Sequence, residues 1–563
     1  MQQDYGAYNA MDRAVWRFML LQVRARLLDT AAPIYRTGLA ATGISADKIP
    51  DIREMNDHLT RFGWGAVCVD GFIPPRAFQE FQANGLLPIA ADVRSREHLV
   101  YTPAPDIFHE AAGHAPILPE PTFAAYLRRI GDLGRKAFTL PEEAALDAAI
   151  HELSEKKEDP SLPPEEVARA EAALAAIAAA LPEASEAARL SRLYWWTAEY
   201  GLVGSPEDYK LYGAGLLSSL GESHSCHAPE VRKIPLDEAC TSVSYDITRP
   251  QPQLFVAASF QTLHDVLDRV AGTLAVNVGG ATALTRALRS RELATVTFSS
   301  GAAAMGVLSA VGPRPEAPVW LELSGPTAFA RDGRIGGPSE LARGDGALIV
   351  VGPLADGRDP STLDDRGLEG SGDGSDRLTL RFASGATVEG QPQRRSRGSD
   401  GRLVALELRE ARLSVPGRAP DTRARFVFLA AGAVTGAHAG AIDPRYHPET
   451  AFSDVRIPKH RAFPEAEQQM LGLYEEAERA HSGGAAAMAA EFPHVHAALS
   501  QQAPREWLLR WNLLESLLRV GAAPELARTL RRELEQLEVD FAHRQPIASG
   551  LRVLAGAAPT ALS

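Results

Sequence analysis

The clearest chemical feature of this chain is a pair of histidines, in the stretch HEAAGH from His109 to His114. Two imidazoles on one face of a helix can chelate one metal ion, as in the HExxH motif of zinc proteases. Here four residues, not three, separate the histidines. On an undistorted helix this places them about 140° apart. We therefore expect His109 in the last turn of a helix and His114 in the turn beyond it, with Gly113 supplying the break.

A third ligand candidate is Glu199, which stands in the aromatic stretch RLYWWTAEYGL. A carboxylate in such surroundings is costly unless it is paired or bound to a metal. Two histidines and one carboxylate form the facial triad of non-haem iron(II) oxygenases, which leaves positions open for oxygen, water or substrate. The density of aromatic residues also suits an aromatic substrate.

Other interpretations of these residues stay open at this point. Any two neighbouring histidines can simply be hydrogen-bonded polar side chains. A zinc hydrolase would use His109, Glu110 and His114, although the extra residue in the spacing counts against it. A separate zinc site at His224-Ser225-Cys226-His227 has three potential ligands close together, but the chain has no complementary cysteine pair.

Composition indicates the setting in which this chemistry takes place. A length of 563 residues predicts two or three domains, and the net charge of −13 argues against nucleic acid or an anionic membrane as the main partner. The first residues contain no signal-peptide core or membrane span. Three scattered cysteines suit reduced thiols. We expect a cytoplasmic protein that acts on a small molecule.

Changes in residue composition and in the periodicity of apolar residues divide the chain into three parts. Residues 1–290 hold nearly all the candidate chemistry and show helical periodicity. Within them, residues 141–190 are rich in Ala and Glu, which predicts an insertion of two helices around a turn at Asp159-Pro160-Ser161.

The second half of the chain predicts two further domains. Residues 291–445 consist of short alternating runs, such as VWLELSGP and RLVALELREARLSV, which predict a β-rich barrel or sandwich; the polar stretch from Asp356 predicts a long loop. Residues 446–563 return to helical periodicity. This half is a candidate for oligomerisation, partner docking or a lid. If it carries the function alone, the chain is a non-catalytic binding protein.

The sequence resembles a known family, the pterin-dependent aromatic amino acid hydroxylases, and within it most closely the phenylalanine 4-monooxygenases. The resemblance covers about residues 8–270. It rests on three motifs, namely YTPAPDIFHEAAGHAPIL from Tyr101, LYWWTAEYGL from Leu193 and LYGAGLLSSLGE from Leu211. It implies a mainly helical catalytic domain with small β-sheets.

The resemblance also implies a reaction and its cofactors. Iron(II) would be held by His109, His114 and Glu199, with tetrahydrobiopterin as cosubstrate and O2 as oxidant. L-phenylalanine would be hydroxylated to L-tyrosine. By the same resemblance Glu110 approaches the pterin and a bound water, and Tyr194 flanks the iron.

Further residues take roles from the resemblance alone. Arg94 matches the arginine that binds the substrate carboxylate, and Ser218 matches a serine that hydrogen-bonds near the substrate and a metal-ligating histidine. Asp106, in contrast, is interpreted from its residue type and position, as a helix N-cap. The remaining matches are Tyr101, Thr102 and Trp195 at the amino acid site and Ile73 and Phe78 at the pterin.

The choice of aromatic substrate rests on two positions. Trp195 stands where the tryptophan-hydroxylating branch tends to have Phe, and Ile247 falls roughly where the tyrosine-hydroxylating branch has an acidic residue. Both favour phenylalanine, with tryptophan and tyrosine as alternatives. In the C-terminal region, LARTLRRELEQLEVDF has apolar spacing that can pack within its own domain or form a homo-oligomer.

Overall fold

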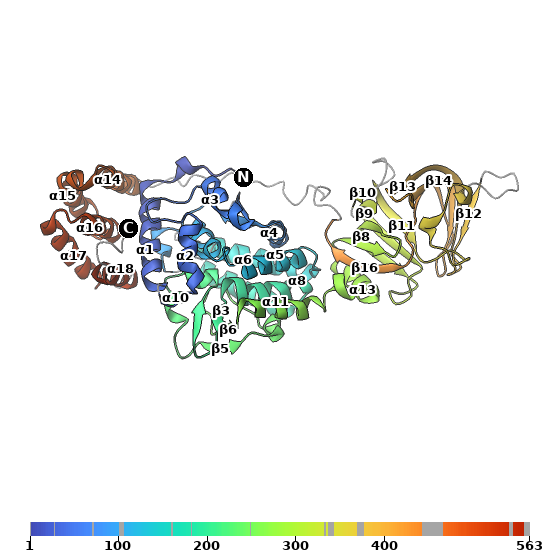
Figure 1. The fold of residues 1–563 in the computed structure, drawn as a ribbon, viewed down its shortest axis with the longest axis horizontal. Helices are drawn as coiled ribbons and strands as arrows, with labels where there is room; N and C mark the ends of the chain where they lie inside the picture. Colours follow the sequence, from blue (N-terminus) through green and yellow to red (C-terminus); the bar gives the residue numbers. More distant parts are fainter. Residues whose placement is uncertain are drawn as a thin grey trace.

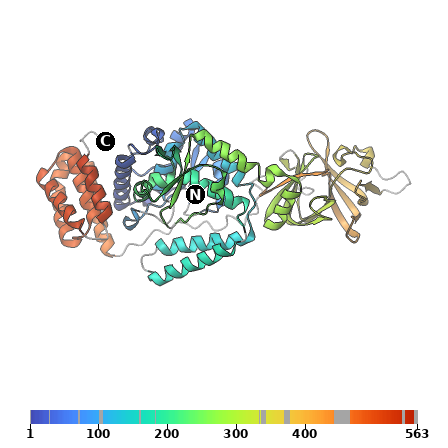
Figure 2. The same ribbon diagram turned by 90° about the horizontal axis from the view of Figure 1, so that it is seen from below.

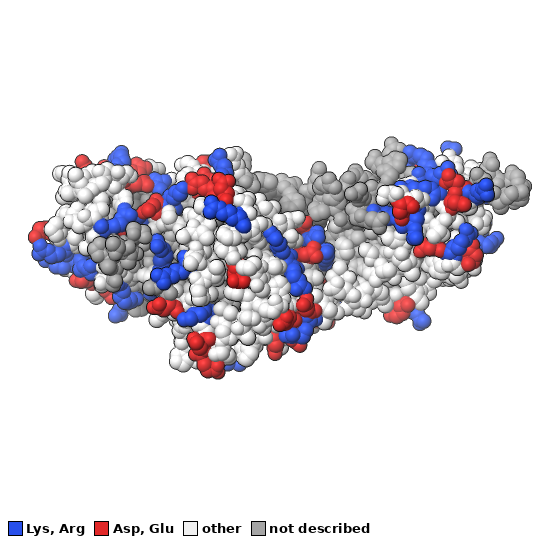
Figure 3. Space-filling view, viewed as in Figure 1, with Lys and Arg blue, Asp and Glu red and all other residues white. Residues whose placement is uncertain are grey.

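The structure is a computed structural model that describes residues 2–556, apart from 28, 70–72, 101–105, 159–161, 182, 248, 332–333, 336–342, 369–376, 442–464 and 540–543. Along its longest axis lie a C-terminal helical part at one end, the block that carries the histidine pair in the middle, and a β-rich part at the other end (Figure 1). On the face seen in Figure 3, basic and acidic side chains are interspersed.

Helices dominate the middle block. The first, α1 (Ala10–Leu27), is buried at every position from 14 to 23. The others are α2 (Pro33–Ala41), α3 (Ile52–Leu59), α4 (Pro75–Ala83), α5 (Pro121–Gly134), α6 (Pro141–Glu158), α7 (Pro164–Ala180), α8 (Glu186–Tyr194), α9 (Ala214–Ser218), α10 (Glu222–Ser225), α11 (Phe260–Ala271), α12 (Ala275–Val278) and α13 (Gly280–Ser290). A helix buried on all sides has partners on all sides, and α1 lies between the middle block and the C-terminal helices (Figure 1).

Two small sheets complete the middle block. Strands β1 (Gly65–Val69) and β2 (Leu86–Ala90) pair in parallel. The second sheet has the order β4-β3-β6-β5, formed by β3 (Leu202–Gly204), β4 (Tyr209–Leu211), β5 (Arg232–Pro235) and β6 (Gln253–Ala257). The middle block is therefore mainly helical with small sheets.

Helices α6 and α7 form the predicted insertion. They lie side by side along one flank of the middle block (Figure 2), and they contact each other. The turn expected at Asp159-Pro160-Ser161 lies outside the described residues.

The β-rich part contains two antiparallel sheets. One has the order β10-β9-β8-β7-β16, with β11 also paired to β9, and the other has the order β12-β13-β14-β15. Their strands are β7 (Leu293–Phe298), β8 (Ala302–Gly312), β9 (Trp320–Arg331), β10 (Arg334–Ile335), β11 (Arg343–Val350), β12 (Leu378–Arg381), β13 (Thr387–Arg397), β14 (Leu403–Ser414), β15 (Asp421–Leu429) and β16 (Val434–Ala439). One apolar core lies between the larger sheet and α13, and a second joins β11 to the smaller sheet.

The C-terminal part consists of α14 (Glu465–Ser482), α15 (Gly484–Gln502), α16 (Trp507–Val520), α17 (Pro524–Leu537) and α18 (Arg544–Gly556). Its apolar side chains belong to the same core cluster as those of the middle block. Phe18 of α1 makes edge-on ring contacts with Trp507 and Trp511, at centroid distances of 5.2 and 4.7 Å. Helix α17 packs against α16 and α18. None of the helices in the described ranges is long and apolar enough to cross a membrane.

Candidate metal centre

The two histidines lie on a π-helical turn, η4 (His109–His114). In such a turn the backbone hydrogen bond spans five residues, and here the Ala115 N–H donates to the Glu110 carbonyl. Residues five apart thus come to the same side, so the wide spacing needs no break in the helix. The predicted break at Gly113 is wrong. Gly113 instead allows close packing, since an added Cβ would lie 2.9 Å from the carbonyl oxygen of Ala214 in α9.

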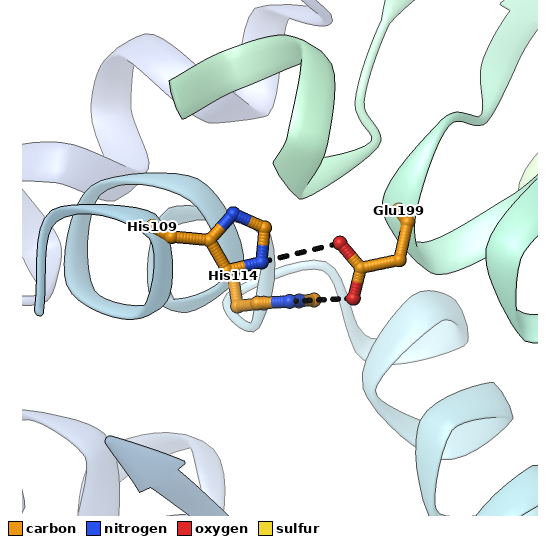
Figure 4. A group of neighbouring side chains, drawn as sticks. All are labelled: His109, His114 and Glu199. Carbon is orange, nitrogen blue, oxygen red and sulfur yellow. Dashed lines mark ion pairs between the residues drawn. The ribbon is translucent and has the colours of Figure 1, made fainter. Parts of the chain in front are cut away.

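Glu199 reaches the histidines from a second π-helical turn, η6 (Trp195–Glu199), which continues α8. Its two carboxylate oxygens lie 3.2 Å from His109 Nε2 and 3.1 Å from His114 Nε2. Figure 4 shows both imidazoles facing this carboxylate. One ligand atom from each residue lies within 4.8 Å of the others, and no other such group of three is found among the described residues.

The surroundings of these atoms fit a divalent cation. His114 is 2% exposed, and its Nε2 makes no hydrogen bond within the described chain. Burial alone would raise the pKa of Glu199, but the two histidines hold that pKa well below its usual range. An ionised carboxylate and two imidazoles suit a divalent transition metal, with open positions left for other ligands.

Ser218 fixes the orientation of the His109 ring. Its hydroxyl donates to the Ala214 carbonyl at 2.7 Å and lies 2.9 Å from His109 Nδ1. Because a serine hydroxyl has one proton, Ser218 must accept the second bond from the Nδ1–H. The lone pair of His109 is then on Nε2, which faces Glu199 and His114.

Glu110 lies beside the three ligand residues as a buried carboxyl. Burial, together with the charge of Glu199, raises the pKa of Glu110 to about 8 despite nearby His114. Its Oε2 lies 3.9 Å from His114 Nε2 and has no hydrogen-bond partner among the described residues. Its burial therefore favours the protonated form of this carboxyl beside the metal position.

Arg94 is tied to the segment that precedes the histidines. Its guanidinium makes two 2.8 Å hydrogen bonds to the Asp106 carboxylate and one of 3.1 Å to the Ser218 carbonyl. Asp106 also accepts from the His109 backbone N–H at 2.9 Å, so it is both the expected cap and the partner of Arg94. These bonds use three of the five guanidinium N–H groups.

Several aromatic rings pack near the ligand residues or on the elements that carry them. Phe78 contacts Tyr194 edge-on at 5.6 Å, and Tyr194, whose hydroxyl accepts from Gln82 at 2.6 Å, lies 6.5 Å from the His114 ring. Half-buried Trp195 stacks on Tyr245 at 4.2 Å, with 9° between the ring planes.

Three further residues were expected at this site, namely Ile73, Tyr101 and Thr102. Ile73 is half-buried, two residues before α4. Tyr101 and Thr102 lie outside the described residues.

Comparison with known proteins gives one matching family. The sequence model of one family, the biopterin-dependent aromatic amino acid hydroxylases, matches residues 7–139 and 166–279. The phenylalanine-4-hydroxylase of Chromobacterium violaceum is 31% identical over 271 residues, which are 48% of this chain and 73% of the relative. That of Ralstonia nicotianae is 31% identical over 268 residues, 47% of this chain and 72% of the relative.

The chain belongs to the biopterin-dependent aromatic amino acid hydroxylases. It is therefore a pterin-dependent aromatic amino acid monooxygenase, as the resemblance predicted. A solved phenylalanine hydroxylase of C. violaceum, with bound iron(III) and oxidised 7,8-dihydrobiopterin, is 27% identical and has a TM-score of 0.37, covering 48% of this chain and 84% of that one.

The alternative zinc site of this hydroxylase does not assemble. Burial raises the pKa of the Cys226 thiol to about 12, and His224, Cys226 and His227 form no cluster of three potential ligand atoms in the described chain. The His227 ring stacks on Tyr209, and His224 and His227 line a small cavity with Arg26 and Arg552. All three cysteines are buried free thiols.

Sequence reasoning missed two residues that contact the candidate residues, Tyr245 against Trp195 and Gln82 against Tyr194. Tyr245 belongs to a loop without a motif, and Gln82 follows Phe78 by one helical turn in α4. The sequence offered one signal for Gln82: it lies four residues after Phe78, so both side chains lie on one face of the helix.

Proposed function

We propose that this hydroxylase converts L-phenylalanine to L-tyrosine with O2 and tetrahydrobiopterin at a mononuclear non-haem iron(II). The observation that carries the proposal is the convergence of His109, His114 and Glu199 on one point. The phenylalanine-4-hydroxylases among the relatives, at about 30% identity, support the choice of substrate. Bound iron would supply, with the pterin and O2, the oxidising chemistry at the ring.

The chain's own residues would bind and orient the reactants. Arg94 is proposed to bind the substrate carboxylate through the N–H groups that Asp106 and Ser218 leave available, because a guanidinium fork matches a carboxylate. Trp195, which packs against both Tyr245 and Tyr200, is proposed to line the site of the substrate ring. Tyr101 and Thr102 are proposed to complete the amino acid site.

The pterin side would be formed by α4 and the residues before it. Phe78 is proposed to stack on the pterin ring, with Ile73 as an apolar neighbour. Glu110, with its raised pKa, would hold a proton close to the pterin and the metal. Tyr194 lies between Phe78 and His114 and would exclude water from the space between pterin and iron.

We also propose a domain organisation for the chain. Residues 1–290, including the insertion at 141–190, would form the catalytic domain, followed by a β-rich domain at 291–445 and a helical region at 446–563. The cytoplasmic location and the homo-oligomer stay predictions from the sequence.

An assay with three amino acids tests the proposed function. Phenylalanine, tyrosine and tryptophan are each supplied with tetrahydrobiopterin, iron(II) and O2, and product and pterin oxidation are followed separately. We expect tyrosine from phenylalanine, coupled to pterin oxidation. Pterin oxidation without any hydroxylated product would show that the substrate is something else.

A further inference from the structure

A glutamate at the start of α16 contacts the segment of the middle block that carries Arg94. Glu506 is the N-cap of α16, and its Oε1 accepts from the backbone N–H groups of Leu508 at 3.0 Å and Leu509 at 3.3 Å. The same oxygen accepts from the Tyr474 hydroxyl of α14 at 2.8 Å. Oε2 accepts a charge-assisted hydrogen bond from Arg96. One buried side chain thus joins two C-terminal helices to a residue 410 positions earlier.

Arg96 lies two residues after Arg94, in a segment without long regular structure. The 3-10 turn η3 (Arg96–His98) is the only regular element in the described residues 91–100 and 106, before the helical residues 107 and 108 that lead into η4. Such a segment has no ladder of backbone bonds, so side-chain contacts hold it in place. The Tyr8 hydroxyl donates to the Ala91 carbonyl at 2.6 Å, and Arg94 is held by Asp106. Arg96 is held from outside the middle block.

The C-terminal helices are themselves firmly docked on α1. Arg17 makes a double hydrogen bond to the fully buried Glu515 of α16, at 2.9 and 2.8 Å. The hydroxyl of Ser549 in α18 donates to the side chain of Gln22 at 2.6 Å. Because α16 is anchored at Glu515 and by ring contacts at Trp507 and Trp511, its first turn presents Glu506 at a fixed place.

We infer that Glu506 and Arg96 form a positioning contact, through which the C-terminal helices hold Arg94 in the geometry that binds the substrate carboxylate. The inference rests on the proposed function and gives residues 465–556 a role in it. The described contacts run from Glu506 to Arg96, along the backbone to Arg94, and on to Asp106 and His109. Neither Glu506 nor Arg96 would touch the reacting atoms.

Glu506→Gln is the most selective variant. Its amide oxygen can still accept from Leu508, Leu509 and Tyr474. Its NH2 group would face the guanidinium of Arg96, and two donor groups form no hydrogen bond with each other. We expect the KM for L-phenylalanine to rise about 10-fold, the loss typical of one charge-assisted hydrogen bond. Since Arg94 binds the carboxylate rather than the ring, kcat and the KM for tetrahydrobiopterin should stay within about 2-fold.

Companion variants separate positioning from stability. Arg96→Ala should reproduce the effect, Arg96→Lys should recover part of it, and Arg96→Ala combined with Glu506→Gln should be no worse than either alone, because the two residues act as one unit. Glu322→Gln is the matched control: Glu322 accepts two hydrogen bonds from Arg418, and both residues lie in the β-rich part. It should leave the KM for phenylalanine unchanged.

The outcomes distinguish this inference from the proposed function. A wild-type KM for phenylalanine in Glu506→Gln, or equal losses in kcat and in both KM values together with a lower Tm, would overturn the positioning role. Wild-type protein that binds L-phenylalanine in calorimetry but makes no tyrosine would contradict the proposed function alone. Wild-type protein that does neither would contradict both.

Discussion

Ser218 accepts a hydrogen bond from His109 Nδ1 at 2.9 Å while donating its own proton to Ala214. This relationship sets which nitrogen of His109 faces the metal position. Partners that orient a ligating histidine usually affect metal affinity strongly when they are removed.

Ser218→Ala should therefore weaken iron binding by about 10–100-fold. The freed His109 ring can rotate or change its tautomer, so fewer molecules present Nε2 to the metal. Iron(II) titration of metal-free protein measures the change. Ser225→Ala, in the nearby α10, is the control and should bind iron like the wild type; equal affinities in all three proteins would contradict this role of Ser218.

Gly113→Ala should destabilise the protein by about 1–3 kcal/mol, since the added methyl group is forced against α9. Its Cβ would lie 2.9 Å from the Ala214 carbonyl oxygen and 3.1 Å from the Ala214 Cβ. Gly472→Ala in α14, whose Cβ would meet nothing within 4 Å, should instead be up to about 1 kcal/mol more stable. Urea unfolding compares the two, and equal stabilities would refute the close-packing explanation.

The ligand residues of the candidate centre were predictable because each lies in a distinctive stretch of sequence. His109 and His114 were predicted from their residue type and spacing, Glu199 from its aromatic sequence neighbours, and the three together from the family resemblance. The π-helical turns were not found, since the residues that widen a helix by one position leave no periodic pattern. Gly113 was taken for a break because its close neighbour, Ala214, is 101 positions away.

For the C-terminal half, the kind of secondary structure was predictable from the sequence, but the contacts between its elements and the rest of the chain were not. Strand β8, AAAMGVLSAVG, was missed because alanine and glycine favour strands weakly, and α15 carries Pro493 in its interior, which normally ends a helix. The Arg96–Glu506 contact joins residues with no shared motif. Only the packing of α1 against the C-terminal helices brings them together.

Glu222 should make stability depend on pH. Burial raises the pKa of Glu222 from 4.5 to about 7, although the Tyr200 hydroxyl donates to it. Between these values the folded chain keeps the proton and the unfolded chain has lost it, so rising pH favours unfolding. The stability present below about pH 4.5 should fall by about 3 kcal/mol by pH 7.

Glu222→Gln removes this titration and leaves an acceptor for Tyr200. The free energy of unfolding is measured in urea for both proteins at several pH values from about 4.5 to 8. The value for the wild type should fall relative to that of the variant as pH rises. A difference that is the same at every pH would show that Glu222 is not protonated in the folded protein.

Trp195→Phe should alter substrate preference. A smaller ring in front of Tyr245 leaves space for a two-ring substrate, so the ratio of kcat/KM for tryptophan to that for phenylalanine should rise about 10-fold. Trp320→Phe in the distant β9 should leave the ratio as it is. An unchanged ratio in Trp195→Phe would place Trp195 outside the substrate pocket.

Tyrosine formation as iron(II) is added to metal-free protein, with L-phenylalanine, tetrahydrobiopterin and O2 present, tests the central claim most directly. In the wild type, activity should rise and saturate at about one iron per chain, as a single facial triad requires, while Glu199→Ala should stay inactive over the same range. Full activity of Glu199→Ala, or a wild type that is active with zinc and needs no pterin, would contradict the account.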